Sequence, residues 1–570
     1  MKLLVKDYLK GLRERDELDR LLPDLLSEMG LHVFMIPQQG PRQFGVDCGA
    51  VGRLPRGAEK RLYLFVIKCG DITKGEWSRE GQGVRASIEE CFDVYIPRFV
   101  PPEYVHLPVT ICICCGGDVR QEISPNVDSY KAIEGRKHRC EIKTWNGDYI
   151  AGLIAEHFCN TKLFVEGVPS ELLRSLAMVT ESDVSFQYFR TLTNKFLEDT
   201  TKVSLGQKLS RVRQLNLCLG MLFSWGEKAK NLDAPYLAAE LVLVRVWRYL
   251  GVGSKSSKLY LRKCIDAYIP TLRFYIQIAM RYVQRVQPYL TEPYLFAFSA
   301  SGNDEVDVNC KTFDVLGRLA ATGCMIYCFA EGMKDAWQGR NAQESANAKA
   351  AIQLITDCIV HMLKLNPTSN WALQDDYAGT IALVCAFLGT VDKTDVIRGW
   401  LLRIIATLQD YYRRGKIYPV ARLGYRKLLE YTHQGRMAQE EYAKYLPSSE
   451  LLPTLALISN QFDCNEAYDA LVDIQENVLR KCNFQLLFYE NDVEDAATGK
   501  VGGNAGIVLH SICLRDRVGF LKSVRAESKA NGLKLALPGL FQGVLFVGLH
   551  HYGMPLPPGF MLSPDQDEAK

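Results

Sequence analysis

The chain has 570 residues, which is too long for one ordinary hydrophobic core, so we expect two to four domains. Hydrophobic residues make up 48% of the chain and charged residues 23%, which is typical of a globular protein and excludes a disordered one. Because 68 lysines and arginines face 65 aspartates and glutamates, any nucleic-acid surface must be a local patch.

The two ends of the chain predict a cytoplasmic protein without a membrane span. The first segment, MKLLVKDYLKGLRERDELDR, becomes charged too early to leave room for the apolar part of a signal peptide. Near the other end, the apolar run LALPGLFQGVLFVGL is interrupted by Pro538 and Gln542. It is also shorter than the roughly 20 residues that a helix needs to cross a bilayer.

Residues 1–165 alternate between helical and strand patterns. A helical pattern ending in LLSEMG precedes the apolar runs LHVFMIP, FGVDCGAVG and RLYLFVIKC. A second helical pattern, GVRASIEECFDVYI, is followed by VTICICC and HRCEIKTW. Such alternation predicts an α/β domain. Within it, the alternating cysteines of VTICICC predict buried thiols of a core strand rather than a zinc site, because paired CxxC spacing is absent.

Residues 166–482 predict a large all-helical domain. Apolar residues recur there at helical spacing, for example Ile397, Leu401, Ile404 and Leu408. We place the domain boundary near residue 165, just before a helix start at Ser170. Residues 483–570 form a third region whose fold the sequence does not predict. In that region His550 and His551 adjoin, and because consecutive residues point in different directions we interpret the pair as a loop feature.

Two charged residues frame the apolar runs of the α/β domain. Asp47 lies at the start of one run, and Lys68 ends the strongly apolar segment LYLFVIK. A lysine at the end of a buried strand loses hydration, so it must find a carboxylate, a phosphate or a catalytic role.

This order of elements resembles the PD-(D/E)xK nuclease superfamily, the restriction-endonuclease-like fold, and within it the Mrr-like and antiphage-effector nucleases. The resemblance covers residues 1–165. In this resemblance, Asp19 corresponds to the acidic residue of the family's first helix, and Asp47 of GVD corresponds to the metal-binding aspartate. Lys68 corresponds to the lysine of the (E/Q)xK element. The implied activity is metal-dependent DNA cleavage, with Asp47 and Asp19 as ligands of magnesium or manganese.

The chain departs from the family pattern at Val66, which occupies the acidic or amide position of the (E/Q)xK element. Three interpretations stay open. The second ligand has moved to Glu89 or Glu90 on the following helix, or it is replaced by a backbone carbonyl together with Asp19. Alternatively the site is inactive, and Lys68 and Asp47 form a structural ion pair.

The helical domain contributes two basic patches interleaved with aromatic residues, a combination that suits phosphates and stacked bases. A solvated helix face is the alternative. The cations we assign to nucleic-acid binding are Arg245, Arg248, Lys255 and Lys258 in the first patch and Arg413, Arg414 and Lys416 in the second. No nucleotide-binding loop accompanies them, because GVGSKSSK lacks the required spacing.

We therefore expect a metal-dependent DNA endonuclease that acts in microbial antiphage defence. The catalytic candidates are Asp47, Lys68, Asp19 and Glu89. DNA is the expected ligand, and the helical domain is expected to bind a protein partner or a second copy of the chain. The alternative is a catalytically degenerate nuclease fold that binds DNA or protein as a scaffold.

Overall fold

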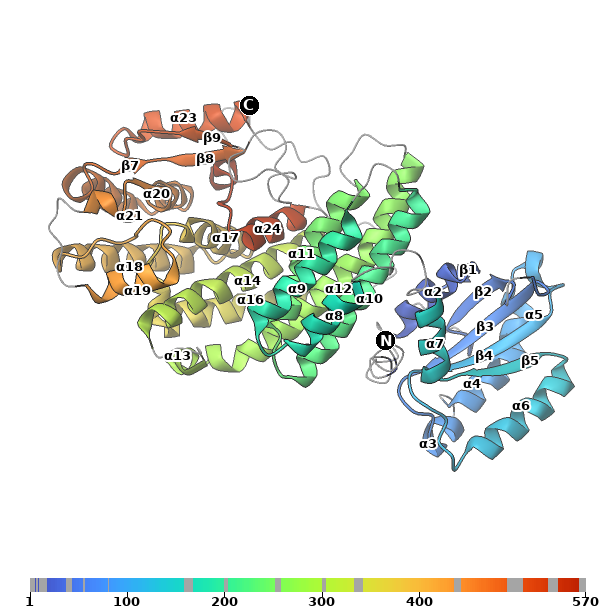
Figure 1. The fold of residues 1–570 in the computed structure, drawn as a ribbon. Helices are drawn as coiled ribbons and strands as arrows, with labels where there is room; N and C mark the ends of the chain where they lie inside the picture. Colours follow the sequence, from blue (N-terminus) through green and yellow to red (C-terminus); the bar gives the residue numbers. More distant parts are fainter. Residues whose placement is uncertain are drawn as a thin grey trace. The chain divides into compact units, whose positions relative to one another are not determined.

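The computed structural model describes residues 6, 9, 18–36, 44–54, 57–79, 81, 83–157, 168–198, 203–251, 258–299, 304–332, 342–434, 442–489, 506–531 and 542–562. The chain divides into two compact units, Met1–Ala238 and Ala239–Lys570 (Figure 1). Residues 158–167 lie outside the described residues, so the expected boundary near residue 165 stays a prediction, as does the one near residue 482.

The first unit contains a five-stranded mixed sheet in the order β1-β2-β3-β4-β5. Strand β2 runs antiparallel to its neighbours β1 and β3, and β3, β4 and β5 run parallel. The strands are β1 His32–Met35, β2 Cys48–Gly52, β3 Arg61–Lys68, β4 Val109–Cys115 and β5 Glu141–Trp145. The sheet and the helices around it confirm the predicted α/β region.

Strand β3 lies in the middle of the sheet, and its apolar run has a simple cause. Residues 62–67 are all buried because helices cover both faces of the sheet. Alternation places Leu62, Leu64 and Val66 in the core cluster on one face. On the other face, the ring of Phe65 meets Trp145 edge to face, with centroids 5.3 Å apart.

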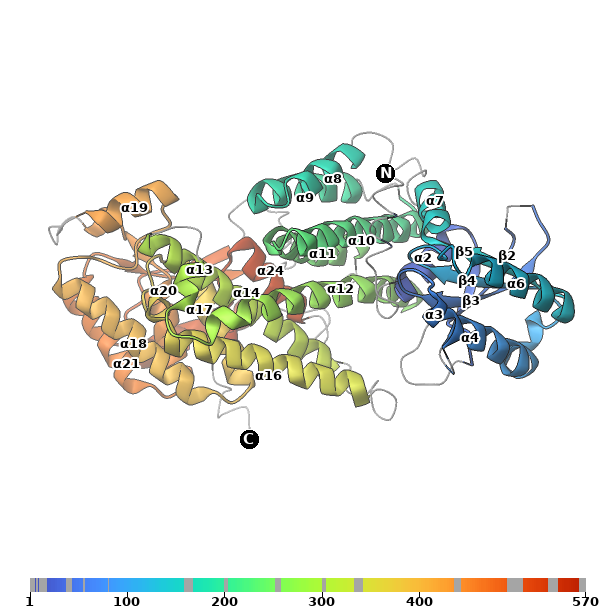
Figure 2. The same cartoon turned by 90° about the horizontal axis from the view of Figure 1, so that it is seen from below.

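Two groups of helices cover the sheet, one on each face (Figure 2). On the face of Val66 lie α3 Lys74–Ser78, α4 Val84–Glu90, a π-helical turn Cys91–Tyr95, α5 Ile96–Phe99 and α6 Ser124–His138. On the opposite face lie α2 Asp19–Glu28 and α7 Gly147–His157. A short 3₁₀ helix, Pro102–Tyr104, leads into β4.

Three further helices complete the first unit: α8 Val168–Ala177, α9 Ser182–Leu197 and α10 Leu205–Lys228. Polar contacts join α10 to α2. Glu28 accepts hydrogen bonds from Ser210 Oγ at 2.9 Å and from Arg213 at 2.6 Å. Burial raises the pKa of neighbouring Asp24 to about 6, against the opposing effect of Arg213. The sheet and these helices thus belong to one packed unit.

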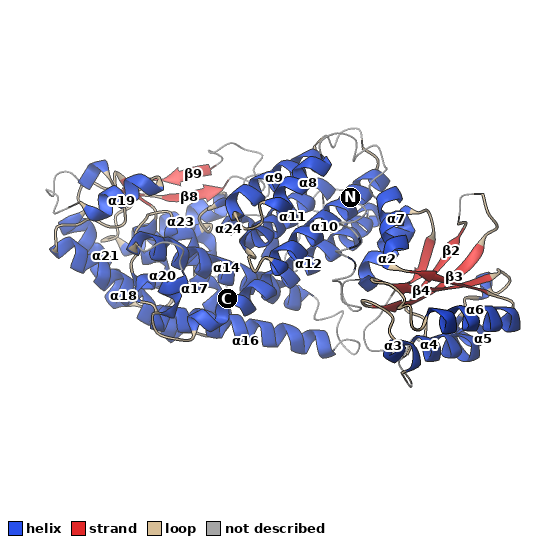
Figure 3. Cartoon of the chain, turned by 60° about the horizontal axis from the view of Figure 1, so that its bottom comes forward, coloured by secondary structure: helices blue, strands red, loops and turns tan. Residues whose placement is uncertain are grey.

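The second unit is mainly helical, as predicted (Figure 3). The predicted apolar stripe from Ile397 to Leu408 is buried in α18. Helix α11, Asp233–Leu250, crosses the division between the units. Among the described residues, the further α-helices of this unit are α12 Lys258–Leu290, α13 Leu295–Ser299, α14 Glu305–Gly332, α16 Ala342–Leu365, α17 Tyr377–Thr390, α18 Thr394–Arg413, α19 Tyr425–His433, α20 Leu451–Gln461, α21 Asn465–Asp473, α23 Arg517–Ala530 and α24 Gln542–Tyr552.

Two small sheets supplement these helices. They pair β6 Ser448–Ser449 with β7 Asn483–Phe484, and β8 Leu486–Tyr489 with β9 Gly506–Leu509. Within the described ranges, α14 is the one helix that is long and apolar enough to cross a membrane. Of its most apolar window, 78% is buried inside the protein, as expected of a core helix.

Candidate functional site

Asp47 and Lys68 lie at the same edge of the sheet. Asp47 immediately precedes β2, Lys68 ends β3, and the two strands are antiparallel neighbours. The carboxylate Oδ2 of Asp47 accepts a hydrogen bond from the backbone N–H of Ile67 at 2.7 Å. The Asp47 backbone N–H donates to Phe65 at 2.9 Å. These bonds hold the carboxylate beside the residue that precedes Lys68.

Val66 lies next to Asp47 but inside the apolar core. Cys48 pairs with Phe65, so the next step of the register places Asp47 opposite Val66. The Val66 side chain is 1% exposed and belongs to the same core cluster as Ile88 of α4. Position 66 therefore lies opposite Asp47 on the neighbouring strand, in apolar surroundings.

Glu89 forms an ion pair within its own helix. Helix α4 buries Val84 and Ile88, whereas Glu89 is exposed and accepts a hydrogen bond from Arg85 Nε at 2.9 Å. A role of Glu89 as a relocated ligand stays a prediction. Its neighbour Glu90 is half-buried.

Asp19 lies in the first turn of α2, where it is half-buried. Helix α2 packs on the face of the sheet opposite to the core cluster that contains Val66. Across the described part of the chain, no three aspartate, glutamate, histidine or cysteine side chains gather as a metal-binding group. Among the described residues, Asp47 is a carboxylate that the strand register places on the strand next to that of Lys68.

Sequence reasoning missed a repeated turn at this edge. Each of the parallel strands is followed by the pattern x-Gly-Asp, at residues 69–71, 116–118 and 146–148. The Gly117 N–H donates to Gly70 at 2.8 Å, and the Gly147 N–H donates to Gly117 at 2.7 Å. A Cβ atom on Gly117 would lie 2.2 Å from Asp71 Oδ1, so only glycine permits this approach.

The aspartates of these turns bind one loop to the next. Asp71 accepts the Asp118 N–H at 2.9 Å and pairs with Arg120 at 2.7 Å. Asp118 in turn accepts from Asn146 Nδ2 at 2.9 Å and lies 3.3 Å from the Lys6 ammonium. The turns therefore form a polar ladder that fixes the loop after Lys68. The repetition of x-Gly-Asp after each strand was the signal available in the sequence.

The cysteines of β4 are core residues, as predicted. Cys112, Cys114 and Cys115 are completely buried. Burial raises the pKa of Cys112 well above its ordinary value and that of Cys115 to about 12. These thiols therefore stay protonated and unreactive near neutral pH.

The first basic patch differs from the expectation. Arg245 and Arg248 are half-buried on α11, and the adjacent aromatic residues Trp247 and Tyr249 are buried in the helical core. Those rings therefore face the core and are not available to stack on bases. Lys255 lies outside the described residues, and Lys258 begins α12 with a side chain that the structure does not describe.

The second basic patch is partly structural. Arg413 and Arg414 are exposed at the end of α18, where Arg414 pairs with Asp410 at 2.6 Å. The half-buried Lys416 instead donates to the carbonyl of Thr432 at 2.6 Å. The rings of Tyr411 and Tyr418 pack edge to face, with their centroids 4.8 Å apart. The arginines thus face solvent, while the tyrosines hold the end of α18 against its neighbours.

The prediction of a loop at His550 and His551 is wrong. Both residues lie in α24, and both rings bind one carboxylate, that of the fully buried Glu240. Two consecutive histidines of one helix can share this partner because each carboxylate oxygen of Glu240 accepts a hydrogen bond from one of the two rings.

Comparisons with protein-family models, with curated proteins and with solved structures give no match to this chain.

Proposed function

We propose that the sheet region of the first unit is a PD-(D/E)xK-type nuclease domain that cuts DNA with magnesium or manganese. The observation that carries this proposal is the position of Asp47 and Lys68 at the ends of neighbouring strands, at one edge of the sheet. The order of elements, a helix followed by three antiparallel strands, also agrees with the resemblance.

The chemistry of this pair suits phosphodiester hydrolysis. A divalent ion held by Asp47 and the substrate would stabilise charge on the phosphoryl oxygens. Lys68 contributes a positive charge at the phosphate and orients the attacking water by hydrogen bonding. The hydrogen bond from Ile67 keeps the Asp47 carboxylate in place, and the Gly-Asp ladder keeps the loop after Lys68 in place.

The setting that we propose is a cytoplasmic effector or subunit of a microbial antiphage defence system, and this part rests on the resemblance alone. DNA would contact exposed arginines such as Arg413 and Arg414. A protein partner or a second copy of the chain would bind through the helical region.

A scaffold function is the second candidate, and a specific observation favours it. Val66 is buried where the family carries an acid, and no three-ligand group forms within the described ranges. In that case Asp47 and Lys68 are structural, and the fold binds DNA or protein without cutting it.

Plasmid cleavage separates the two candidates. Purified protein is incubated with supercoiled plasmid in magnesium, in manganese and in chelator, beside the variants Asp47→Asn and Lys68→Ala. A nuclease loses cleavage in both variants while they stay folded, and Lys74→Ala on the exposed start of α3 serves as the matched control. Absence of cleavage by the wild type, together with much lower melting temperatures of both variants, would establish the scaffold.

A further inference from the structure

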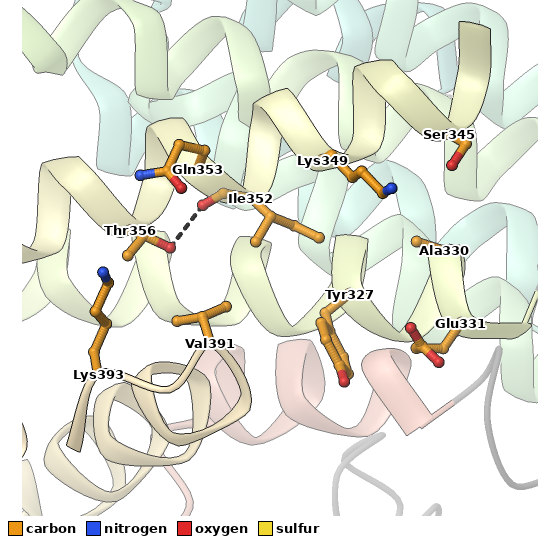
Figure 4. Close-up of a pocket in the computed structure, with 10 residues that line it drawn as sticks. All are labelled: Tyr327, Ala330, Glu331, Ser345, Lys349, Ile352, Gln353, Thr356, Val391 and Lys393. Atoms are coloured by element: carbon orange, nitrogen blue, oxygen red, sulfur yellow. Dashed lines mark hydrogen bonds between the residues drawn. The ribbon is translucent and has the colours of Figure 1, made fainter. Parts of the chain in front are cut away.

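The second unit contains a pocket of about 410 Å³ that the nuclease proposal does not use (Figure 4). Its volume lies in the range of small-molecule sites. One wall is a face of α16, where Lys349, Ile352, Gln353 and Thr356 recur at helical spacing. The other walls come from the end of α14 and from the turn that joins α17 to α18.

Charge and apolar surface alternate along this pocket. Figure 4 shows Lys393 at one end and Lys349 toward the other, with Val391, Ile352 and the ring of Tyr327 between them. Asp392 adopts a left-handed backbone conformation, with φ of 55°, in the turn that carries Val391 and Lys393. The pocket therefore has Lys393 at one end, Lys349 together with the carboxylate Glu331 toward the other, and an apolar middle.

The two ammonium groups have no carboxylate partner within the described part of the chain. No aspartate or glutamate there lies within 4.0 Å of either nitrogen. Glu331 is the one carboxylate among the lining residues, beside Ala330 on α14. The lining thus carries two positive charges and one negative charge.

We propose that this pocket binds a small organic dianion, a molecule with two anionic groups separated by an apolar body. Each lysine ammonium attracts one anionic group of the ligand. The apolar body of the ligand covers Ile352, Val391 and the Tyr327 ring and so removes them from water. A molecule with one anionic group engages one end and leaves the other lysine hydrated. A molecule with two phosphates and a polar body pairs with both lysines, but its polar body leaves the apolar residues in the middle of the pocket in contact with water.

Calorimetric titration of the full chain with three probes tests the proposal at low salt. Suberate and octanoate share one carbon chain length and differ by one carboxylate, whereas fructose 1,6-bisphosphate carries two anionic groups on a polar body. We expect suberate to bind most tightly. Each of Lys349→Ala and Lys393→Ala should weaken suberate binding about threefold, the scale of an exposed charge pair, and abolish its advantage over octanoate.

Two further variants make the result specific. Glu331→Gln should strengthen suberate binding, because it removes the negative charge of the lining. Lys364→Ala, on the exposed side of α16 outside the pocket, should leave it unchanged. The proposal is overturned if suberate shows no saturable binding, or if its advantage over octanoate survives in both lysine variants. None of these readouts depends on DNA cleavage.

Discussion

The buried carboxylate of Glu240 lies 2.8 Å from Nδ1 of His550 and binds α24 to the helical core. Its second oxygen lies 3.1 Å from Nδ1 of His551. A Cβ atom on Gly317 would lie 2.6 Å from the His550 ring, so α14 admits the ring by carrying no side chain there. Asp314 and Arg318 of α14 also act on His550 electrostatically.

Protonation sets the strength of this contact. Burial alone would raise the pKa of Glu240, but the two histidines lower it to about 2. Burial alone would lower the pKa of His550, but Glu240 outweighs it and raises that pKa. The histidine contribution is therefore complete below its unfolded pKa of about 6.5 and is lost as the pH rises through the folded value. The glutamate contribution is complete above about 4.5 and is lost as the pH falls toward 2.

We expect Glu240→Gln to lower the free energy of unfolding by roughly 3 to 5 kcal/mol between pH 4.5 and 6.5, because a buried pair loses one partner. The difference from wild type should shrink as the pH rises above that window. Urea unfolding across pH measures it, and the exposed His510→Gln is the control. A constant difference at all pH values would contradict the pairing.

Val66→Glu should destabilise the first unit in the absence of metal, by roughly 2 to 4 kcal/mol, because the new carboxylate enters an apolar core. If Asp47 binds metal, magnesium should restore part of this loss, because the strand register places position 66 opposite Asp47 on the neighbouring strand. Thermal melts with magnesium and with chelator provide the measurement. The double variant Val66→Glu with Asp47→Asn is the control, and equal recovery with and without the Asp47 carboxylate would exclude a metal shared by the two positions.

Gly117→Ala should lower the free energy of unfolding by roughly 3 kcal/mol, because the added Cβ would collide with Asp71 Oδ1 and with the backbone of Gly70. The control is Gly75→Ala in α3, where the nearest atom is Thr73 Oγ1 at 3.7 Å. That substitution should be neutral or slightly stabilising, since alanine favours helices. Equal unfolding midpoints of the two variants would show that the Gly-Asp ladder tolerates a side chain.

Glu450→Gln should stabilise the second unit in alkaline solution. Burial, assisted by Asp375, raises the pKa of Glu450 to about 7, against the hydrogen bond from Leu487 N–H. The stability cost of this carboxyl therefore develops as the pH rises from about 4.5 to 7, and above pH 7 it reaches about 3 kcal/mol for a shift of this size. Wild type and variant should unfold alike at pH 4 and diverge by pH 8.5. An opposite divergence would mean that the charged carboxylate is the stabilising form.

Arg413→Glu combined with Arg414→Glu should weaken DNA binding and flatten its dependence on salt, because fewer counterions are released. Lys416 is left intact in this test, since its bond to Thr432 supports the fold. Binding is measured by fluorescence anisotropy over a salt series, with Lys364→Glu as the control. An unchanged slope would remove this surface from any DNA interface.

Local periodicity predicted much of the architecture. Ile397 and Leu408 follow helical spacing because one face of α18 is buried along its length. The strands of the first region were equally predictable from the sequence. Strand β3, for example, is a continuous apolar run because helices cover it on both faces. The placement of Asp47 and Lys68 at the ends of neighbouring strands also followed from sequence, because consecutive strands tend to pair and these residues lie at the open end of the β2–β3 hairpin.

Contacts between distant segments were decided only by the tertiary structure. Spacing within α4 does not say which face meets the sheet, and only the structure showed that Glu89 pairs with Arg85. The basic patch of α11 looked suited to bases until burial took Trp247 and Tyr249 into the core. Glu240 and His550 lie 310 residues apart, and no local pattern links them. Periodicity reports how much of an element is buried, whereas the partner of a polar group depends on how the elements pack.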